Sequence, residues 1–244
     1  MARFFVSASL LAQPDCVLTG DNAAHAKVMR LRTGDCVTLC DGEGHECSAE
    51  ITSVSGGTYC LKLSEIKESS SEPFCRASVY MAYAKSDKID HVVQKATELG
   101  AAEIVLFPSE RCVSRPDAKS AKSKAERWQR IALSAAEQSG RGRIPQVVIC
   151  DSYSEALSRA AQADTFLFFY ENEWERSIGA ILQDEKPRTL SLMSGPEGGF
   201  EPSEVEKAFA AGAHVCTLGP RILRCETAPL CALSVCMFAL GEYD

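Results

Sequence analysis

The stretch SGPEGGF, residues 194–200, lies between the apolar run TLSLM (189–193) and the segment EPSEVEKAFAAG (201–212). Its glycines and proline exclude a helix or a strand at this point. Three glycines in five positions also let the backbone approach another group closely. One interpretation is a tight turn between a strand and a helix, and the other is a loop whose backbone contacts a ligand.

The chain after residue 73 alternates between expected strands and expected helices. The strands are ASVYMAYA (77–84), AEIVLFP (102–108), QVVIC (146–150), TFLFFY (165–170), RTLSLM (188–193) and AHVCTLG (213–219). The helices are 86–100, 119–139, 152–162, 202–212 and 227–240. The last helix is apolar on all sides, which predicts that it is buried. Such alternation predicts an α/β fold with a mainly parallel sheet covered by helices.

The first 66 residues have a different pattern. FFVSASLL (4–11), CVTLC (36–40), CSAEITSV (47–54) and TYCLKLSEI (58–66) are short, β-rich and separated by turn sequences. They predict a small closed β-barrel. One short helix is also expected over 22–32, and it carries Lys27, Arg30 and Arg32. The polar joint KESSSEP (67–73) predicts a domain boundary, with domains at 1–70 and 74–244.

Composition limits the class of protein. The 244 residues carry a net charge of −7, which argues against a protein that binds nucleic acid over most of its surface. A local basic face is still allowed. The twelve cysteines form no CxxC pair, and the four histidines are scattered, so no metal site is expected. We interpret the cysteines as reduced thiols of a cytoplasmic protein; the alternative is a secreted, disulfide-bonded chain with the N-terminal stretch as signal peptide. No apolar run approaches the length of a membrane span.

Ligands of open α/β sheets bind beyond the carboxyl ends of the strands. Three segments meet this condition: FFYENE (168–173), SGPEGGF (194–200) and LGPRILRCETA (218–228). Neither GxxxxGK[ST] nor a GxGxxG that follows a strand is present, so a P-loop enzyme and a dinucleotide-binding enzyme are not supported.

The third loop and its surroundings carry a family resemblance. SGPEGGF followed by LGPRILRCETAPLCAL (218–233) resembles the RsmE-type ribosomal RNA methyltransferases of the SPOUT superfamily. MARFFV, HAKVMRLRTGDCVTLCDGEGHE, QKATELGA and RWQRIALSAAEQSGR resemble further segments of that family in the same order, so the likeness spans the chain. Cys225 stands where a threonine is usual, and Pro229 where a small residue is usual.

The resemblance implies an N-terminal PUA-like RNA-binding β-barrel and a C-terminal SPOUT domain with a deep trefoil knot, a rare feature that spacing cannot reveal. It implies S-adenosylmethionine as cofactor and methylation of N3 of one uridine in the decoding region of 16S rRNA in the small ribosomal subunit. It also implies a homodimer in which the partner completes each site. The cofactor contacts are then expected from Phe169, Tyr170, Met193, Ser194, Gly195, Pro196, Glu197, Gly198, Gly199, Leu218, Gly219, Ile222, Leu223 and Thr227.

The chemistry implied by the resemblance leaves the catalytic roles open. Uridine N3 must lose a proton, and a positive group beside the uracil carbonyls would stabilise the anion. Arg221 or Arg224 would serve, while Glu197 or Glu226 would orient an arginine or accept the proton. In the alternative, purely structural interpretation, Glu197 and Arg224 only tie the loops together.

RNA contacts are expected from local basic surface. Residues 111–143 hold nine Lys or Arg against three Asp or Glu. Lys27, Arg30 and Arg32 form a second basic patch on the predicted barrel. The full set of expected RNA contacts is Arg3, Lys27, Arg30, Arg32, Arg115, Arg141 and Arg143. The rival functions are a non-catalytic RNA-binding protein and a SPOUT methyltransferase that acts on tRNA or on a ribose 2′-OH.

Overall fold

The structure is a computed structural model that describes residues 1–115, 118–183 and 186–243, except the side chains of 118–120. Its backbone contacts divide the chain into two compact units. The N-terminal unit comprises Met1–Glu72 together with Ala136–Ile144, and the C-terminal unit comprises Pro73–Ala135 and Pro145–Asp244. A short piece from the middle of the chain therefore belongs to the N-terminal unit, which the sequence did not indicate.

The N-terminal unit is built on a mixed sheet. Its strands, in spatial order, are β1 (Ala2–Phe5), β3 (Cys36–Cys40), β4 (His45–Ser55), β5 (Thr58–Leu63) and β2 (Asp15–Leu18), with β6 (Lys67–Glu68) also paired to β4. Only the pairing of β1 with β3 is parallel among these. Buried apolar side chains, among them Phe4, Leu39, Ile51 and Leu61, form its core, because alternate residues of each strand face inward.

Two local predictions for this unit are wrong. The expected strand over 4–11 stops at Phe5, and α1 (Ala8–Leu11) follows because the Ser7 side chain accepts the Leu10 amide as an N-cap. The expected helix over 22–32 is α2 (Gly20–Val28). It ends early because Arg30 has a φ of 59°, in the left-handed region that stops a helix. Only Lys27 of the three basic residues lies on the helix.

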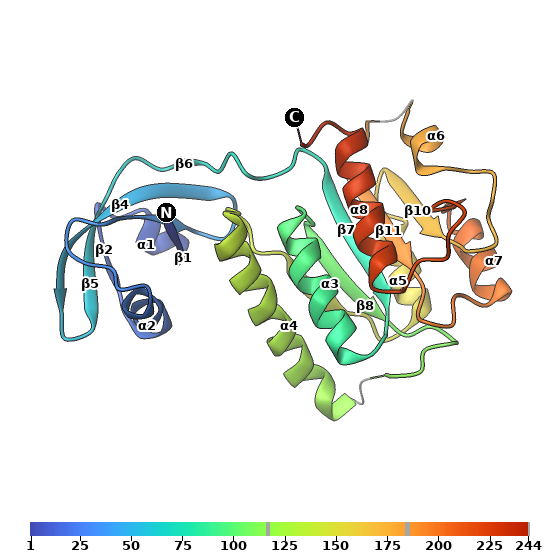
Figure 1. Cartoon of the computed structure of the whole chain (residues 1–244), viewed down its shortest axis with the longest axis horizontal. Helices are drawn as coiled ribbons and strands as arrows, with labels where there is room; N and C mark the ends of the chain where they lie inside the picture. Colours follow the sequence, from blue (N-terminus) through green and yellow to red (C-terminus); the bar gives the residue numbers. More distant parts are fainter. Residues whose placement is uncertain (116–117, 184–185, 244) are drawn as a thin grey trace. The chain divides into compact units, whose positions relative to one another are not determined.

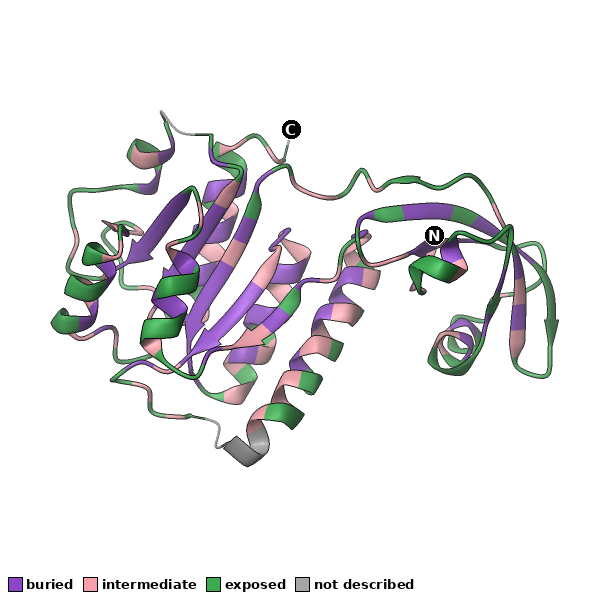
Figure 2. Cartoon of the chain, turned by 180° about the vertical axis from the view of Figure 1, so that it is seen from behind, coloured by how far each residue is buried: buried purple, intermediate pink, exposed green. Residues whose placement is uncertain are grey.

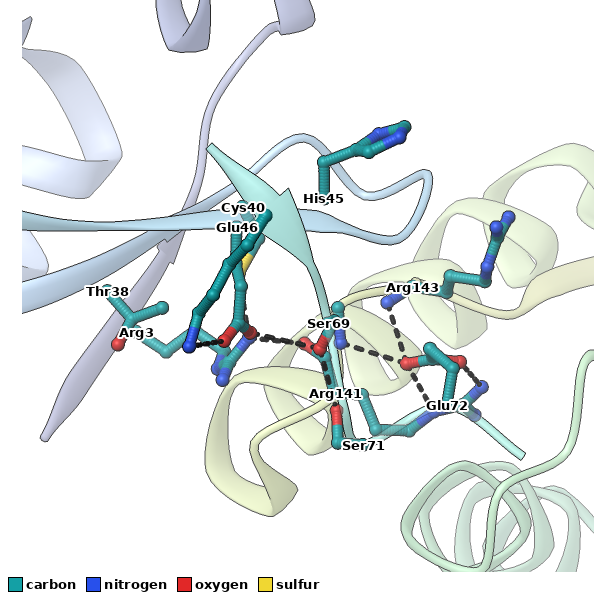
Figure 3. Close-up of polar contacts among 12 residues, drawn as sticks. Arg3, Thr38, Cys40, His45, Glu46, Ser69, Ser71, Glu72, Arg141 and Arg143 are labelled. Atoms are coloured by element: carbon teal, nitrogen blue, oxygen red, sulfur yellow. Dashed lines mark hydrogen bonds and ion pairs between the residues drawn. The ribbon is translucent and has the colours of Figure 1, made fainter. Parts of the chain in front are cut away.

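One carboxylate fastens the inserted segment 136–144 to the N-terminal unit (Figure 3). Glu72 Oε1 accepts the backbone amides of Gly142, at 2.9 Å, and of Arg143, at 3.0 Å, while its Oε2 lies 2.7 Å from Arg141 Nη2. Nearby, Glu46 Oε2 accepts from Arg3 Nη1 at 2.8 Å. Because these groups are largely shielded from water, the pairs are stronger than exposed ones.

The C-terminal unit contains an all-parallel sheet. The spatial order is β12 (His214–Cys216), β10 (Thr165–Phe169), β11 (Thr189–Ser194), β7 (Arg76–Ala82), β8 (Glu103–Phe107) and β9 (Gln146–Ile149). These strands are buried along most of their length (Figure 2), as expected when helices cover both faces.

The helices of this unit cover the sheet on both sides. Their bounds are α3 (Ser86–Glu98), α4 (Ala118–Ser139, which ends in the N-terminal unit), α5 (Tyr153–Ala160), α6 (Ile178–Leu182), α7 (Pro202–Ala210) and α8 (Thr227–Ala239). In Figure 1, α3 and α8 lie in front of the sheet and α5 lies behind it. The expected elements are present, and α6 is an addition. The prediction that α8 is buried on all sides is wrong, because one face is buried while Val235 and Phe238 are 41% and 72% exposed.

Among the described helices, none combines the length and apolar content needed to cross a membrane. Nor do the described residues bring together three His, Cys, Asp or Glu side chains that could bind a metal ion.

Glu72→Ala should destabilise the N-terminal unit by about 3 kcal/mol, because it removes the acceptor of two backbone amides and the ionic partner of the buried Arg141. Urea unfolding followed by circular dichroism measures the change. The control is Glu68→Ala, at an exposed carboxylate on β6. Equal stability of the two variants would contradict the anchoring role of Glu72.

Candidate functional site

The candidate site lies where three neighbouring strands end. β10 pairs in parallel with β11 on one side and with β12 on the other, so their carboxyl ends reach the same edge of the sheet. The segments that leave these ends are the three loops expected from the sequence, 168–173, 194–200 and 218–228. Their convergence follows from the strand order alone.

The second half of the loop 194–200 is fixed by a turn, by a ring contact and by a hydrogen bond from another loop. Gly199 has a φ of +69° and donates its amide to Pro196 O at 3.0 Å, which closes a turn that an L side chain would strain. Phe200 is buried and its ring centroid lies 4.4 Å from that of Phe168. From the loop after β8, Arg111 donates to Gly198 O at 3.0 Å. These contacts fix the backbone of residues 196–200 at the edge of the sheet.

The loop 218–228 turns at Gly219, whose φ is +97°. The hydroxyl of Thr217 accepts the Gly219 amide at 3.1 Å. Two amides at the start of α8 then donate to Arg224 O, both at 2.9 Å, so the residues before the helix are ordered by its first turn. Arg221 and Arg224 are exposed.

The two loops and the end of β10 surround a cavity of about 550 Å³. Its lining is Lys88, Phe169, Tyr170, Glu171, Trp174, Ser194, Gly195, Pro196, Glu197, Gly198, Gly199, Thr217, Leu218, Gly219, Pro220, Arg221, Ile222, Leu223, Arg224, Cys225 and Ala228. All of these residues belong to the C-terminal unit. The volume and the glycine-rich walls suit a small organic ligand recognised by main-chain groups.

Most of the residues expected to contact a cofactor line this cavity. The exceptions are Met193, which is buried in the sheet core, and Thr227, the first residue of α8. Of the expected catalytic residues, Glu197, Arg221 and Arg224 line the cavity, and Glu226 does not, although it contacts the lining residues Lys88 and Cys225. The residues that the sequence analysis missed are Lys88, Glu171, Trp174, Thr217, Pro220, Cys225 and Ala228.

Lys88 is the most informative of the missed residues. Its Nζ lies 3.3 Å from Glu197 Oε1 and 3.2 Å from Glu226 Oε2. Burial opposes the charge on Lys88, but its hydrogen bonds to Glu226 and Glu197 outweigh that effect and raise its pKa. No signal in the sequence pointed to it, because α3 has an ordinary amphipathic pattern.

The same contacts set the charge of the carboxylates. Burial opposes ionisation of Glu197 and Glu226, but backbone amides and Lys88 lower the pKa of both. Between them, burial and the hydrogen bond to Glu226 raise the pKa of Cys225 to about 12, so its thiol stays protonated and donates to Glu226 Oε2 at 3.2 Å. Both carboxylates are thus anions and weak bases near neutral pH.

The purely structural alternative, in which Glu197 and Arg224 pair with each other and join the loops, is wrong. Glu197 pairs with Lys88 instead. In the part of the chain that the structure describes, the guanidinium groups of Arg221 and Arg224 have no hydrogen-bond or ion-pair partner, although the backbone carbonyl of Arg224 accepts two amides of α8. Both guanidinium groups are therefore available to a ligand at the cavity.

The residues expected to bind RNA fall into two groups. Lys27, Arg30, Arg32 and Arg143 are exposed. Arg3 and Arg141 are instead engaged by Glu46 and Glu72 inside the N-terminal unit. In the C-terminal unit, Arg115 donates to the backbone carbonyls of Ser109 and Glu110. The sequence could not separate the groups, because it does not locate the opposing carboxylates.

Comparisons with known proteins agree with this arrangement. The sequence profile described as an RNA methyltransferase domain matches residues 70–237, and that of an RNA methyltransferase PUA domain matches residues 18–64. The chain belongs to the RNA methyltransferase family. The ribosomal RNA small subunit methyltransferase E of Bacillus subtilis is 37% identical over an alignment 246 residues long, gaps included. The alignment covers 96% of this chain and 95% of that protein. Its namesake from Synechocystis is 32% identical over 210 residues, 85% of this chain and 67% of that protein.

Solved structures of methyltransferases extend the likeness. The ribosomal RNA small subunit methyltransferase E of Neisseria gonorrhoeae, bound to S-adenosyl methionine, superposes with a TM-score of 0.89 at 32% identity over the whole of both chains. A Legionella pneumophila protein in complex with the same cofactor has a TM-score of 0.85 at 28% identity, over 98% of this chain and 97% of that one. The predicted fold class is confirmed: a PUA-like N-terminal domain and an α/β methyltransferase domain. The trefoil knot stays a prediction.

Gly199→Ala should cost about 1–2 kcal/mol of stability, because an L residue is strained at its positive φ, and the new Cβ would also meet the Glu171 carboxylate. Thermal unfolding measures the loss. Gly179→Ala is the control, because a Cβ there meets nothing within 4 Å. Equal melting temperatures for both variants would show that the turn tolerates a side chain.

Proposed function

We propose that this protein transfers a methyl group from S-adenosylmethionine to N3 of one uridine in the decoding region of 16S rRNA. The observation that carries the proposal is the cavity of about 550 Å³ walled by two glycine–proline loops, in a chain of the RNA methyltransferase family. We place its action in the cytoplasm, where small ribosomal subunits are assembled and thiols stay reduced.

The residues present fit the cofactor. The cavity lies within the size range of small-ligand sites. Backbone amides and carbonyls of the loops 194–200 and 218–228 would hold the adenine, because glycines leave these groups accessible. Glu171 lines the same cavity, and its negative charge complements a cationic ligand. When bound, this cofactor supplies an electrophilic methyl group next to a positively charged sulfur.

The target base needs help from positive side chains. Uracil N3 is a weak acid, and its anion is stabilised by cations fixed beside the carbonyl oxygens. Arg221 and Arg224 line the cavity and are exposed, so they are the groups placed to do this. Glu197 and Glu226 have lowered pKa values, which disfavours them as proton acceptors. We therefore assign the anion-stabilising role to the arginines and a positioning role to the carboxylates, and the N3 proton passes to solvent before the methyl group leaves the cofactor sulfur for N3.

RNA binding is assigned to exposed basic residues of the N-terminal unit. Lys27, Arg30 and Arg32 are exposed around the end of α2, and Arg143 is exposed on the inserted segment. Phosphate contacts of this kind hold a folded RNA by its shape and charge, while the target base leaves its stack to reach a cavity. The small ribosomal subunit or its 16S rRNA is the proposed partner.

The test is to map methylated nucleotides in cells with and without the gene. Loss of one N3-methyluridine from 16S rRNA, restored by the wild-type gene, is the expected result. A methyl group missing from tRNA or from a ribose 2′-OH instead would replace the proposed substrate with another RNA. Unchanged methylation together with no binding of S-adenosylmethionine by calorimetry would leave only an RNA-binding role.

We also propose that two copies of the chain associate through α8. Phe238 and Val235 on this helix are 72% and 41% exposed although the helix is apolar throughout, and exposed apolar faces of this kind are typical of interfaces. Phe238→Asp should convert a dimer into monomers in sedimentation velocity. Phe209→Asp, at an equally apolar exposed position on α7, should leave the dimer intact. A wild-type monomer with full activity would refute the dimer.

Arg224→Ala should slow methyl transfer while cofactor affinity stays largely intact. Loss of one preorganised donor costs roughly 3–4 kcal/mol, or two to three decades in rate. Single-turnover methylation of small subunits with saturating enzyme measures the rate, and calorimetry measures the affinity. The control is Arg188→Ala, an exposed arginine that lies over the Phe74 ring and not at the cavity. Near-wild-type turnover would remove Arg224 from the mechanism.

A further inference from the structure

Lys88 joins the two glycine–proline loops of the cavity through one ammonium group. Glu197 belongs to the loop after β11, and Glu226 directly precedes α8. Lys88 Nζ lies 3.3 Å from the first carboxylate and 3.2 Å from the second. The three side chains are 21% to 27% exposed, so the bridge is partly shielded from water. One side chain of α3 thus links two loops that follow different strands.

The place of Lys88 on its helix is not explained by helix stability. It lies in the first turn of α3 (Ser86–Glu98), where the partial positive charge of the helix end disfavours a cation by roughly 0.3–1 kcal/mol. Asp87 in the same turn is the kind of residue that this end favours. A lysine at this position is therefore accounted for by the carboxylates that it faces.

The carboxylate of Glu226 does not make the capping hydrogen bond expected at its position. Glu226 is the N-cap residue of α8, yet its side chain makes no capping hydrogen bond. Instead it accepts from Lys88 and from the Cys225 thiol, at 3.2 Å in each case. On the other side, Glu197 Oε1 also lies 3.5 Å from the backbone amide of Lys85, the residue before α3. Both carboxylates are directed toward the start of α3.

We propose that Lys88 is a positioning residue that bridges Glu197 and Glu226 and so holds the two loops in the arrangement that binds the cofactor. This inference rests on the proposed function. Without the ammonium group, two anionic carboxylates would face each other with no shared cation, and their repulsion would move the loops apart. Because Arg221 and Arg224 lie in the second loop, the same bridge fixes their backbone relative to the first.

The test begins with calorimetric titration of S-adenosylmethionine into Lys88→Met. We expect about tenfold weaker binding, within the range measured for coupled neighbouring residues, and substantial recovery in Lys88→Arg, which keeps the charge. Lys95→Met is the control, since it removes a lysine of the same helix that pairs with Glu98 at 2.8 Å. Wild-type protein that fails to bind the cofactor would refute the proposed function, whereas wild-type and Lys88→Met proteins that bind equally would refute only the bridge.

A double-mutant cycle separates the bridge from direct contact between Lys88 and the cofactor. Glu226 does not line the cavity, so Glu226→Gln should weaken binding only through Lys88. We expect the double variant Lys88→Met, Glu226→Gln to bind no more weakly than Lys88→Met alone. Additive losses, or wild-type affinity in Glu226→Gln, would overturn the proposal. Should Lys88→Met melt below the assay temperature, affinity in Glu226→Gln and Lys88→Arg decides the question.

Discussion

The parallel pairing of β10 with β11 and β12 is the constraint on which the site depends. It places three carboxyl ends side by side, so the loops that follow these strands lie at the same edge of the sheet. Glycines then determine the backbone conformation of these loops. At Gly199 and Gly219 the backbone takes positive φ values and turns back on itself, so main-chain groups rather than long side chains form much of the wall.

The charged side chains in and beside this cavity are of two kinds, those with an ionic partner and those without one. The carboxylates of Glu197 and Glu226 are compensated by Lys88, which keeps them ionised and fixed. Arg221 and Arg224 stand nearby without such compensation in the described structure. A fixed anion with a cation of its own serves to hold a loop, whereas an uncompensated guanidinium is free to meet the charge that a reaction develops. In the proposed mechanism, this division separates the carboxylates that position the loops from the arginines that stabilise the uracil anion.

Local patterns predicted much of the fold and missed what depends on distant partners. The helical and strand periods of the C-terminal unit, and the three loops, follow from the spacing of apolar residues and glycines. Lys88 could not be found in this way, because Cys225, one of its neighbours, lies 137 positions away in the chain. The ion pairs of Arg3 and Arg141 could not be predicted either, because their carboxylate partners are also distant in the sequence. The end of α2 was predicted wrongly for a conformational reason, because the sequence alone did not indicate the positive φ of Arg30, two residues after the helix.

The insertion of residues 136–144 into the N-terminal unit has a consequence for protein synthesis. Glu72 and Gly142, whose hydrogen bond fastens this segment, are 70 positions apart. At a translation rate of 5–20 residues per second, the second of them leaves the ribosome about 4 to 14 seconds after the first. Strands β7 and β8 and helix α3 are made in that interval. The N-terminal unit is therefore completed only after part of the C-terminal unit has been translated, so the synthesis of the two units overlaps.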